Sequence, residues 1–179
     1  MSNSQDLTHD SHADWPLNWP LPDLSKAAFV AANATVVGQV NLAEGTSIWY
    51  GAVLRGDVEK IQVGKSTNIQ DGAILHGDPG EPTILGDDVT IGHRAVVHSA
   101  QIGDGSLVGI GAIVLNGVRV GTGCIIGAGS VVTKDVPDRS LVMGVPGKVI
   151  RTVSEAEAIG LIEHAQQYKK LALVHAGKG

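Results

Sequence analysis

Three histidines in one stretch of the chain are the side chains best suited to chemistry. His76, His93 and His98 belong to the segment IQDGAILHGDPGEPTILGDDVTIGHRAVVH, residues 69–98 of 179. Imidazole nitrogens are common zinc ligands, and three that converge leave one coordination position open for water or a substrate. The stretch therefore predicts a metal site, provided that the surrounding elements bring the three rings together.

The elements that would position the histidines come from a repeat of six residues. A branched aliphatic residue opens each unit, and Gly or a small residue often follows, which permits a tight corner. Three units make one coil of about 18 residues, the signature of a parallel β-helix. The units open at Leu42, Ile48, Leu54, Val63, Ile69, Leu75, Leu85, Ile91, Val97, Ile102, Val108, Val114 or Leu115, Val120, Ile126 and Val132.

A fixed period of six argues against a β-sandwich, whose strands alternate and vary in spacing. We therefore predict an all-β solenoid, a parallel β-helix of hexapeptide repeats with a C-terminal α-helix. Two steps are longer than the period, nine residues from Leu54 to Val63 and ten from Leu75 to Leu85. We expect extra residues within HGDPGEPT to form a loop, and such loops tend to border binding faces.

The register of the repeat places two of the histidines together. His76 follows Leu75 and His98 follows Val97, and both openers begin the third unit of successive coils. The two Cα atoms should lie about one strand spacing apart, roughly 4.8 Å, so that both side chains can reach one metal ion. His93 lies near a different corner, so we expect it to join the stacked pair of a neighbouring chain in a three-fold assembly.

Other polar residues surround these positions. Arg55 follows Leu54 and extends the stacked column by one coil, while Gln70 and Asp71 follow Ile69, close to the corner of His93. Histidines that merely decorate an exposed surface remain the alternative. Three of them in register beside Arg, Gln and Asp favour a functional site.

The two ends of the chain differ from the repeat. Residues 1–25 are polar and contain Pro16, Pro20 and Pro22, which predicts a flexible start and then an extended segment. We assign residues 26–150 to the β-helix and residues 151–179 to a helix and tail. Ser154 and Glu157 form a capping-box pattern at the start of that helix.

The predicted helix carries apolar residues at helical spacing, which should pack on the solenoid or on a neighbour. They are Ile159, Ile162, Ala165, Tyr168 or Lys169, and Leu173. We expect His164 and His175 to be surface residues. The lone Cys124 lies within an apolar unit and is most simply a small core residue.

The composition excludes several kinds of partner. A net charge of −5 provides no basic footprint for nucleic acid or anionic lipid. No apolar run approaches the roughly 20 residues that span a bilayer. A single cysteine and a start without a basic and apolar leader favour a reducing, cytoplasmic location.

The motifs together resemble the γ-class carbonic anhydrases. The resemblance covers residues 25 to 170 and rests on RGD at 55–57, NIQDG at 68–72, LH at 75–76 and IGHRAVVH at 91–98. It implies a trimeric left-handed β-helix that reversibly hydrates CO2 to bicarbonate by a metal-bound hydroxide. The metal implied is Zn2+, with Fe2+ or Co2+ as possible substitutes.

The resemblance also implies roles for single residues. His76 and His98 of one subunit and His93 of the next would bind the metal. Gln70 and Asn68 would hydrogen-bond the hydroxide and orient the substrate. The charged set that pairs across the subunit boundary would be Arg55, Asp57 and Asp71, with Arg55 near the product bicarbonate. The active-site tyrosine of the helix would be Tyr168.

The chain departs from the family's archetype at two places. Val58 stands where the archetypal enzyme has a glutamate directly after RGD, and a short loop at 77–82 replaces an acidic loop that supplies a proton shuttle. Asp78 and Glu81 are the acidic residues left in this loop. The metal site is therefore a firmer expectation than rapid turnover.

Two further functions remain open. Hexapeptide acyltransferases and thioesterases can use a histidine as general base, and the segment GVPGKVIR resembles their terminal motif. They do not require three converging histidines. The other alternative is a catalytically weak metal-binding trimer that serves as a scaffold, which Val58 and the short loop would suit.

Overall fold

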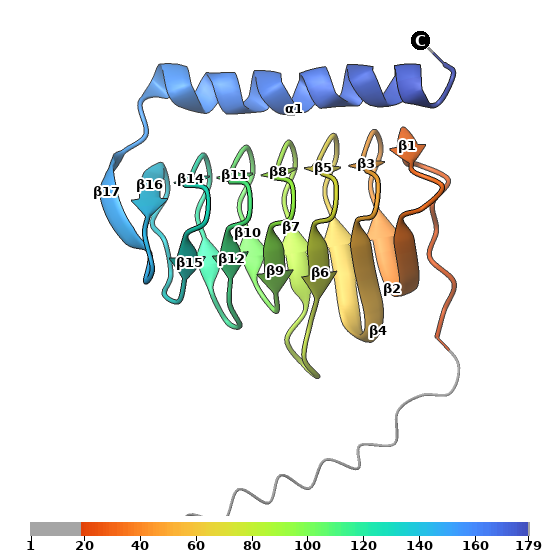
Figure 1. Cartoon of the computed structure of the whole chain (residues 1–179), viewed down its shortest axis with the longest axis horizontal. Coiled ribbons are helices and arrows are strands. Elements are labelled where there is room, and N and C mark those ends of the chain that lie inside the picture. Colours follow the sequence, from red (N-terminus) through yellow and green to blue (C-terminus); the bar gives the residue numbers. More distant parts are fainter. Residues whose placement is uncertain (1–18, 179) are drawn as a thin grey trace, which may run out of the picture.

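The computed structural model describes residues 19–178 and shows the predicted solenoid. The chain coils into a left-handed parallel β-helix, and one long helix lies along it (Figure 1). The start predicted to be flexible falls largely in residues 1–18, outside the described residues. The division at residues 25 and 150 stays a prediction.

The strands line three faces of a triangular prism. The helix face holds β1 (Phe29–Val30), β3 (Ser47–Ile48), β5 (Asn68–Ile69), β8 (Thr90–Ile91), β11 (Leu107–Val108), β14 (Ile125–Ile126) and β16 (Ser140–Met143). The antiparallel strand β17 (Lys148–Thr152) ends that sheet. The histidine face holds β6 (Ile74–His76), β9 (Val96–His98), β12 (Ile113–Val114) and β15 (Val131–Val132).

The third face holds β7 (Thr83–Leu85), β10 (Gln101–Ile102) and β13 (Arg119–Val120). Strands β2 (Thr35–Leu42) and β4 (Val53–Val63) run from the histidine face to the third face without interruption. The nine-residue step between Leu54 and Val63 is thus absorbed by a long strand with a register shift against β2, rather than by a loop.

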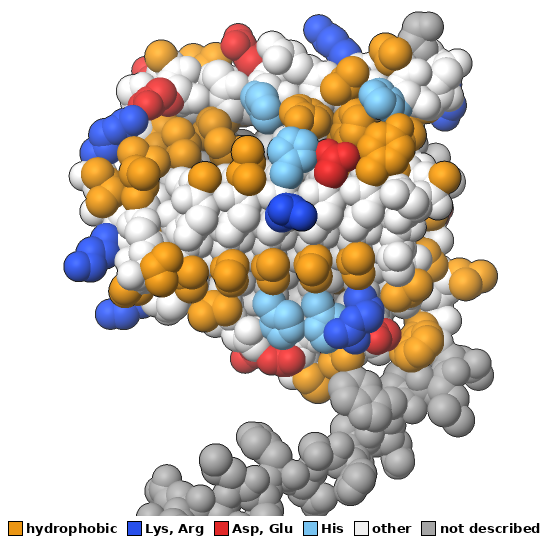
Figure 2. Space-filling model, in the orientation of Figure 1, with side chains coloured by type: hydrophobic (Ala, Val, Ile, Leu, Met, Phe, Trp, Pro, Cys, Tyr) orange, Lys and Arg blue, Asp and Glu red, His pale blue; other side chains and the backbone are white. Residues whose placement is uncertain are grey.

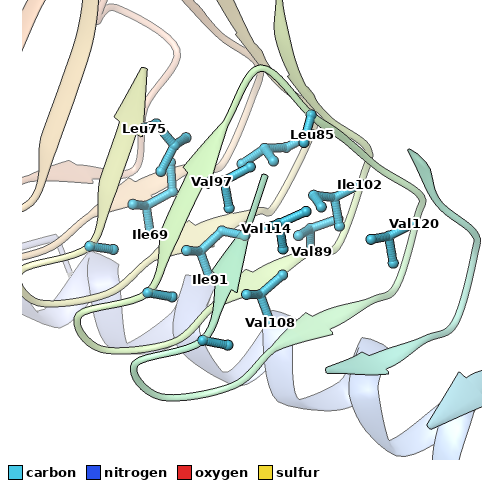
Figure 3. Packing of buried hydrophobic residues seen from close by; sticks show 14 of the residues in the cluster. Ile69, Leu75, Leu85, Val89, Ile91, Val97, Ile102, Val108, Val114 and Val120 are labelled. Carbon is cyan, nitrogen blue, oxygen red and sulfur yellow. The ribbon is translucent and has the colours of Figure 1, made fainter. Parts of the chain in front are cut away.

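The openers of the units form the core. Figure 3 shows Ile69, Leu75, Ile91 and Val97 among the side chains that fill the interior of successive coils. Val114 takes the inward position in its unit at 0% exposure while Leu115 is 40% exposed, which settles the register there. Each such burial contributes roughly 1.5–3 kcal/mol, so the repeat itself stabilises the scaffold.

The positions after the openers must let the coils approach. A Cβ built on Gly92 would lie 2.8 Å from the carbonyl oxygen of Val108 on the next coil, closer than real contacts allow. Glycine is therefore required at the corner that presents His93. The ten-residue step forms the predicted loop, residues 77–82, which projects from the edge of the coil between β6 and β7 (Figure 1).

Helix α1 (Glu155–His175) begins at the predicted capping box, with Ser154 as N-cap. Its buried residues are Ala165 and Ala172, whereas Ile159 and Ile162 are 52% and 44% exposed. The predicted apolar stripe is wrong at Ile159, because the helix is buried against the solenoid only at the small Ala165 and Ala172. Ile162 is partly exposed but lies over Gly105 of the solenoid, where a Cβ built on that glycine would come within 3.1 Å of its side chain. No helix among residues 19–178 is long and apolar enough to cross a membrane.

Candidate metal centre

His76 and His98 lie side by side on the histidine face. They are register partners on β6 and β9, their ring centroids are 5.1 Å apart, and Nδ1 of His76 lies 3.0 Å from Nε2 of His98. The stacking predicted from the repeat is confirmed. It arises because Leu75 and Val97 point inward, so that the next residue on each strand points outward.

An ion pair supports His76 from the preceding coil. Arg55 donates from Nη1 to both carboxylate oxygens of Asp57, at 2.9 and 2.7 Å, and Asp57 Oδ1 lies 3.2 Å from Nε2 of His76. Burial raises the pKa of Asp57, but the bonds from Arg55 and His76 outweigh it, and the pKa is lowered. Burial and the Arg55 charge lower the pKa of His76. A carboxylate therefore faces a neutral imidazole.

Asn116, which the sequence interpretation did not single out, supports His98. Its Oδ1 lies 2.9 Å from Nδ1 of His98, and its amide nitrogen donates to Asp78 in the 77–82 loop. Because the sequence leaves the unit opener undecided between Val114 and Leu115, it does not determine where Asn116 lies relative to His98. Once Val114 is known to point inward, Asn116 falls two positions later, at the turn beside His98.

His93 lies away from the pair, at the corner between the helix face and the histidine face. Its Nδ1 is 2.8 Å from Asp71 Oδ2. Figure 2 shows the separation: two adjacent histidines sit at one border of a row of hydrophobic side chains, and further histidines lie beyond its other border. Within residues 19–178, no three His, Cys, Asp or Glu side chains come close enough to hold a metal ion.

The charged set predicted to act at a subunit boundary is divided in the same way. Arg55 and Asp57 lie with the stacked pair, and Asp71 lies with His93. Any contact between Arg55 and Asp71 would therefore need two chains, as the resemblance implies.

A chain of hydrogen bonds links the His93 corner to helix α1. Gln70 donates from Nε2 to Asn68 Oδ1 at 3.1 Å, and Asn68 donates from Nδ2 to Thr90 Oγ1 at 2.8 Å. Thr90 Oγ1 lies 3.2 Å from Nδ1 of His164. Thr90 accepts from Asn68, and its own O–H remains available to donate to His164 when Nδ1 of that ring is unprotonated. Gln70 keeps its Oε1 free to accept another.

His164 is half-buried, so its prediction as a surface residue is wrong. A groove of about 570 Å3 lies between the helix face and α1, and His164 lines it together with Gln70, His93 and Tyr168. The rest of the lining is mostly apolar and includes Ile110, which is 58% exposed. The helix brings His164 here because α1 runs along the strands that carry the site.

Tyr168 of α1 lines the groove together with His93, and its role as an active-site residue stays a prediction. Its ring packs edge-on against Trp49, with centroids 5.4 Å apart. Burial and the negative charge of Asp71 raise the pKa of its hydroxyl. The hydroxyl therefore stays protonated and can donate a hydrogen bond.

The donor set fits a metal such as zinc. Asp57, Asn116 and Asp71 each face one ring nitrogen of His76, His98 and His93, which leaves the other nitrogen for a ligand. Metal-binding histidines characteristically have such partners. Two nitrogens on one tetrahedral zinc lie about 3.3 Å apart, close to the 3.0 Å between His76 and His98. One chain offers two converging histidine nitrogens, and His93 lies apart from them.

Family models match the repeat. Residues 99–134 match bacterial transferase hexapeptide (six repeats), and residues 82–115 match the hexapeptide repeat of succinyl-transferase. These two matches lie within the coils of the solenoid and reflect its repeat of six residues.

Relatives at high identity are more specific. The chain is 48% identical over 151 residues to a probable carbonic anhydrase of Methanocaldococcus jannaschii, covering 83% of this chain and 95% of that protein. It is 41% identical over 165 residues to gamma carbonic anhydrase 2, mitochondrial, of Arabidopsis thaliana, covering 88% of this chain and 59% of the plant protein. A crystal structure of a hexapeptide transferase family protein from Anaplasma phagocytophilum matches with a TM-score of 0.80 at 41% identity, covering 86% of this chain and 90% of that chain.

Proposed function

The chain belongs to the γ-class carbonic anhydrase family, and from this premise we propose that it catalyses the reversible hydration of CO2 to bicarbonate at a metal site shared between subunits of a homotrimer. The observation that carries the proposal is the pair of ring nitrogens of His76 and His98, which converge at 3.0 Å while His93 stands at the opposite border of the same face.

The surface between these two borders supports the shared site. Outward-facing aliphatic side chains stack in register along the histidine face, forming an apolar ladder: Val53, Ile74, Val96, Ile113 and Val131. Figure 2 shows an evenly spaced row of hydrophobic side chains of this kind. A closed three-fold ring would bury the ladder and bring the His93 border of one subunit to the stacked pair of the next.

The metal would be held by His76 and His98 of one subunit and by His93 of the next. When bound, a metal with three histidines and one open position supplies the Lewis acidity that lowers the pKa of water to about 7. The identity of the native metal, Zn2+ or else Fe2+ or Co2+, is part of the test.

The chain's own residues would orient the reactants. Gln70 has Nε2 committed to Asn68, so its free Oε1 would accept the O–H of the reacting water and aim its lone pair at CO2. Tyr168, whose pKa is raised, would donate from its hydroxyl to an oxygen of bicarbonate. Arg55 would add positive charge near the anionic product.

The hydration releases one proton, which must reach the solvent. Val58 cannot carry a proton, so the exposed carboxylates of the 77–82 loop, Asp78 and Glu81, or a buffer would take it. We therefore expect the rate at saturating CO2 to rise with buffer concentration.

The experiment that tests the function is stopped-flow CO2 hydration on protein purified anaerobically, with metal content measured on the same sample. We expect activity that scales with metal, and loss of both in His93→Ala. His175→Ala is the matched control, because His175 lies outside the groove, hydrogen-bonded to Tyr50. Metal without hydration would instead support a metal-binding scaffold, and full metal and activity in His93→Ala would refute the site.

A mixing experiment tests whether the site is shared. His93→Ala and His98→Ala subunits, each inactive alone, are unfolded together and refolded as a mixture. In a shared site about one quarter of the boundaries in a 1:1 mixture would combine an intact His93 with an intact stacked pair, and metal and activity would return to that extent. A site built within one chain would show no recovery.

Acyl transfer is a second candidate, favoured by the groove beside His93 and by the hexapeptide transferase named among the solved structures. A histidine there could act as general base on an acceptor hydroxyl or amine. This function needs no metal. Acyl transfer from acetyl-coenzyme A by fully metal-free protein, with no CO2 hydration by the loaded protein, would favour it.

A further inference from the structure

The two ring nitrogens of His98 face different partners. Nε2 faces Nδ1 of His76 at 3.0 Å, and Nδ1 faces Oδ1 of Asn116 at 2.9 Å. Asn116 lies directly after β12, one coil beyond His98. A neutral imidazole carries one proton, so the partner of one nitrogen decides whether the other can bind a ligand.

The direction of the bonds follows from Asp78. An ionised carboxylate only accepts, so the amide end of Asn116 that contacts Asp78 must be its NH2 group. The carbonyl end of Asn116 then faces His98 and also only accepts. Nδ1 of His98 must therefore carry the proton, and Nε2 presents a lone pair toward His76.

The loop that holds Asp78 is itself anchored beside the site. The backbone N–H of Asp78 donates to Ser99 Oγ at 2.7 Å, and the backbone N–H of Gly80 donates to Glu59 Oε2 at 2.9 Å. Asp78 Oδ1 lies 4.0 Å from Nε2 of His98, beyond hydrogen-bond distance. Asp78 thus acts on the histidine through Asn116.

We propose that Asn116, oriented by Asp78, is a positioning residue that holds His98 in the Nδ1–H form and so keeps Nε2 ready to bind a divalent metal. The inference rests on the proposed function for the identity of the ligand. It assigns the 77–82 loop a role in metal affinity, separate from the proton transfer considered above.

The first test reads the tautomer in the metal-free protein. Imidazole 15N chemical shifts distinguish a protonated from an unprotonated ring nitrogen, and we expect His98 to show protonated Nδ1 and unprotonated Nε2. In Asn116→Leu, which removes the acceptor at similar size, Nε2 should gain proton occupancy. Asn116→Asp combined with Asp78→Asn exchanges the two groups, so that an acceptor still faces Nδ1 and an amide still donates to it, and this double variant should restore the parent pattern.

The second test measures Co2+ affinity by titration of visible absorption. We expect Asn116→Leu to weaken binding about 10- to 100-fold and the double variant with exchanged groups to bind more nearly as the parent does. Asn41→Leu, a control at an exposed asparagine on β2, should match the parent. Parent-like tautomer and affinity in Asn116→Leu would overturn the inference. Absence of CO2 hydration in a parent chain that binds Co2+ would count against the proposed function alone.

Discussion

Gln70 is the residue whose contacts define its chemistry most sharply. It is 3% exposed, its Nε2 is held by Asn68, and its Oε1 is left for a reactant. We predict that Gln70→Leu lowers kcat for hydration about 10- to 100-fold, less than the 10²–10³ typical of removing an oxyanion donor, while metal content is unchanged. Gln101→Leu, at an exposed glutamine on β10, is the control. Equal kcat in Gln70→Leu and parent would remove Gln70 from the mechanism.

His164 gives a prediction about pH. Burial lowers its pKa, so the folded chain keeps the ring neutral while the unfolded chain takes up a proton below about pH 6.5. The free energy of unfolding should therefore be insensitive to this group above pH 6.5 and should decrease as the pH falls toward the lowered folded value. Urea unfolding at pH 7.5 and 5.5 should show a smaller pH effect in His164→Gln. An equal effect in both proteins would contradict the assignment.

Some site residues could be predicted from sequence and others could not. His76, His98 and Gln70 follow from the period, because an opener that points inward fixes the direction of its neighbours. Asn116 and His164 did not follow, because their roles depend on how far a side chain reaches across coils or down from a helix. The six-residue period carries no information about those distances.

At the scale of elements, the start of α1 is held by charge as well as by its cap. Glu157 accepts from the backbone and hydroxyl of Ser154 and from Arg151, and its pKa is lowered to about 2. A lowered pKa contributes stability above the unfolded value near 4.3, which is lost as the pH falls toward 2. We predict that Glu157→Gln has a lower free energy of unfolding than the parent at pH 7, measured by the helical circular dichroism signal. The two values should converge as the pH falls from about 4.3 to 2. A pH-independent difference would contradict this.

The period predicted the coils because every element repeats one local rule, a branched residue inward and a small residue at the corner. It failed where an element departs from that rule. The step from Leu54 to Val63 is spanned by one long strand that pairs with β2, and Ile159 is 52% exposed instead of packed on the solenoid. Both depend on how two elements approach each other, which is a tertiary property.

At the scale of the molecule, the stacked pair and the His93 corner lie at opposite borders of the apolar ladder. Under the proposed function, burial of the ladder and the third metal ligand both require a neighbouring chain. Sequence register predicted this separation. It could not reveal the groove beside His93, because the groove exists only once α1 lies on the helix face.

A charge placed on the ladder should therefore disrupt assembly and metal binding together. Ile113 stands in register between Val96 and Val131. We predict that Ile113→Glu shifts the protein from trimer to monomer in sedimentation velocity and loses most of its metal, because an unpaired carboxylate buried against the next subunit costs several kcal/mol. Val149→Glu, at a 53% exposed position on β17, should keep both. A trimeric, metal-loaded Ile113→Glu would show that subunits meet elsewhere and that the shared site must be redrawn.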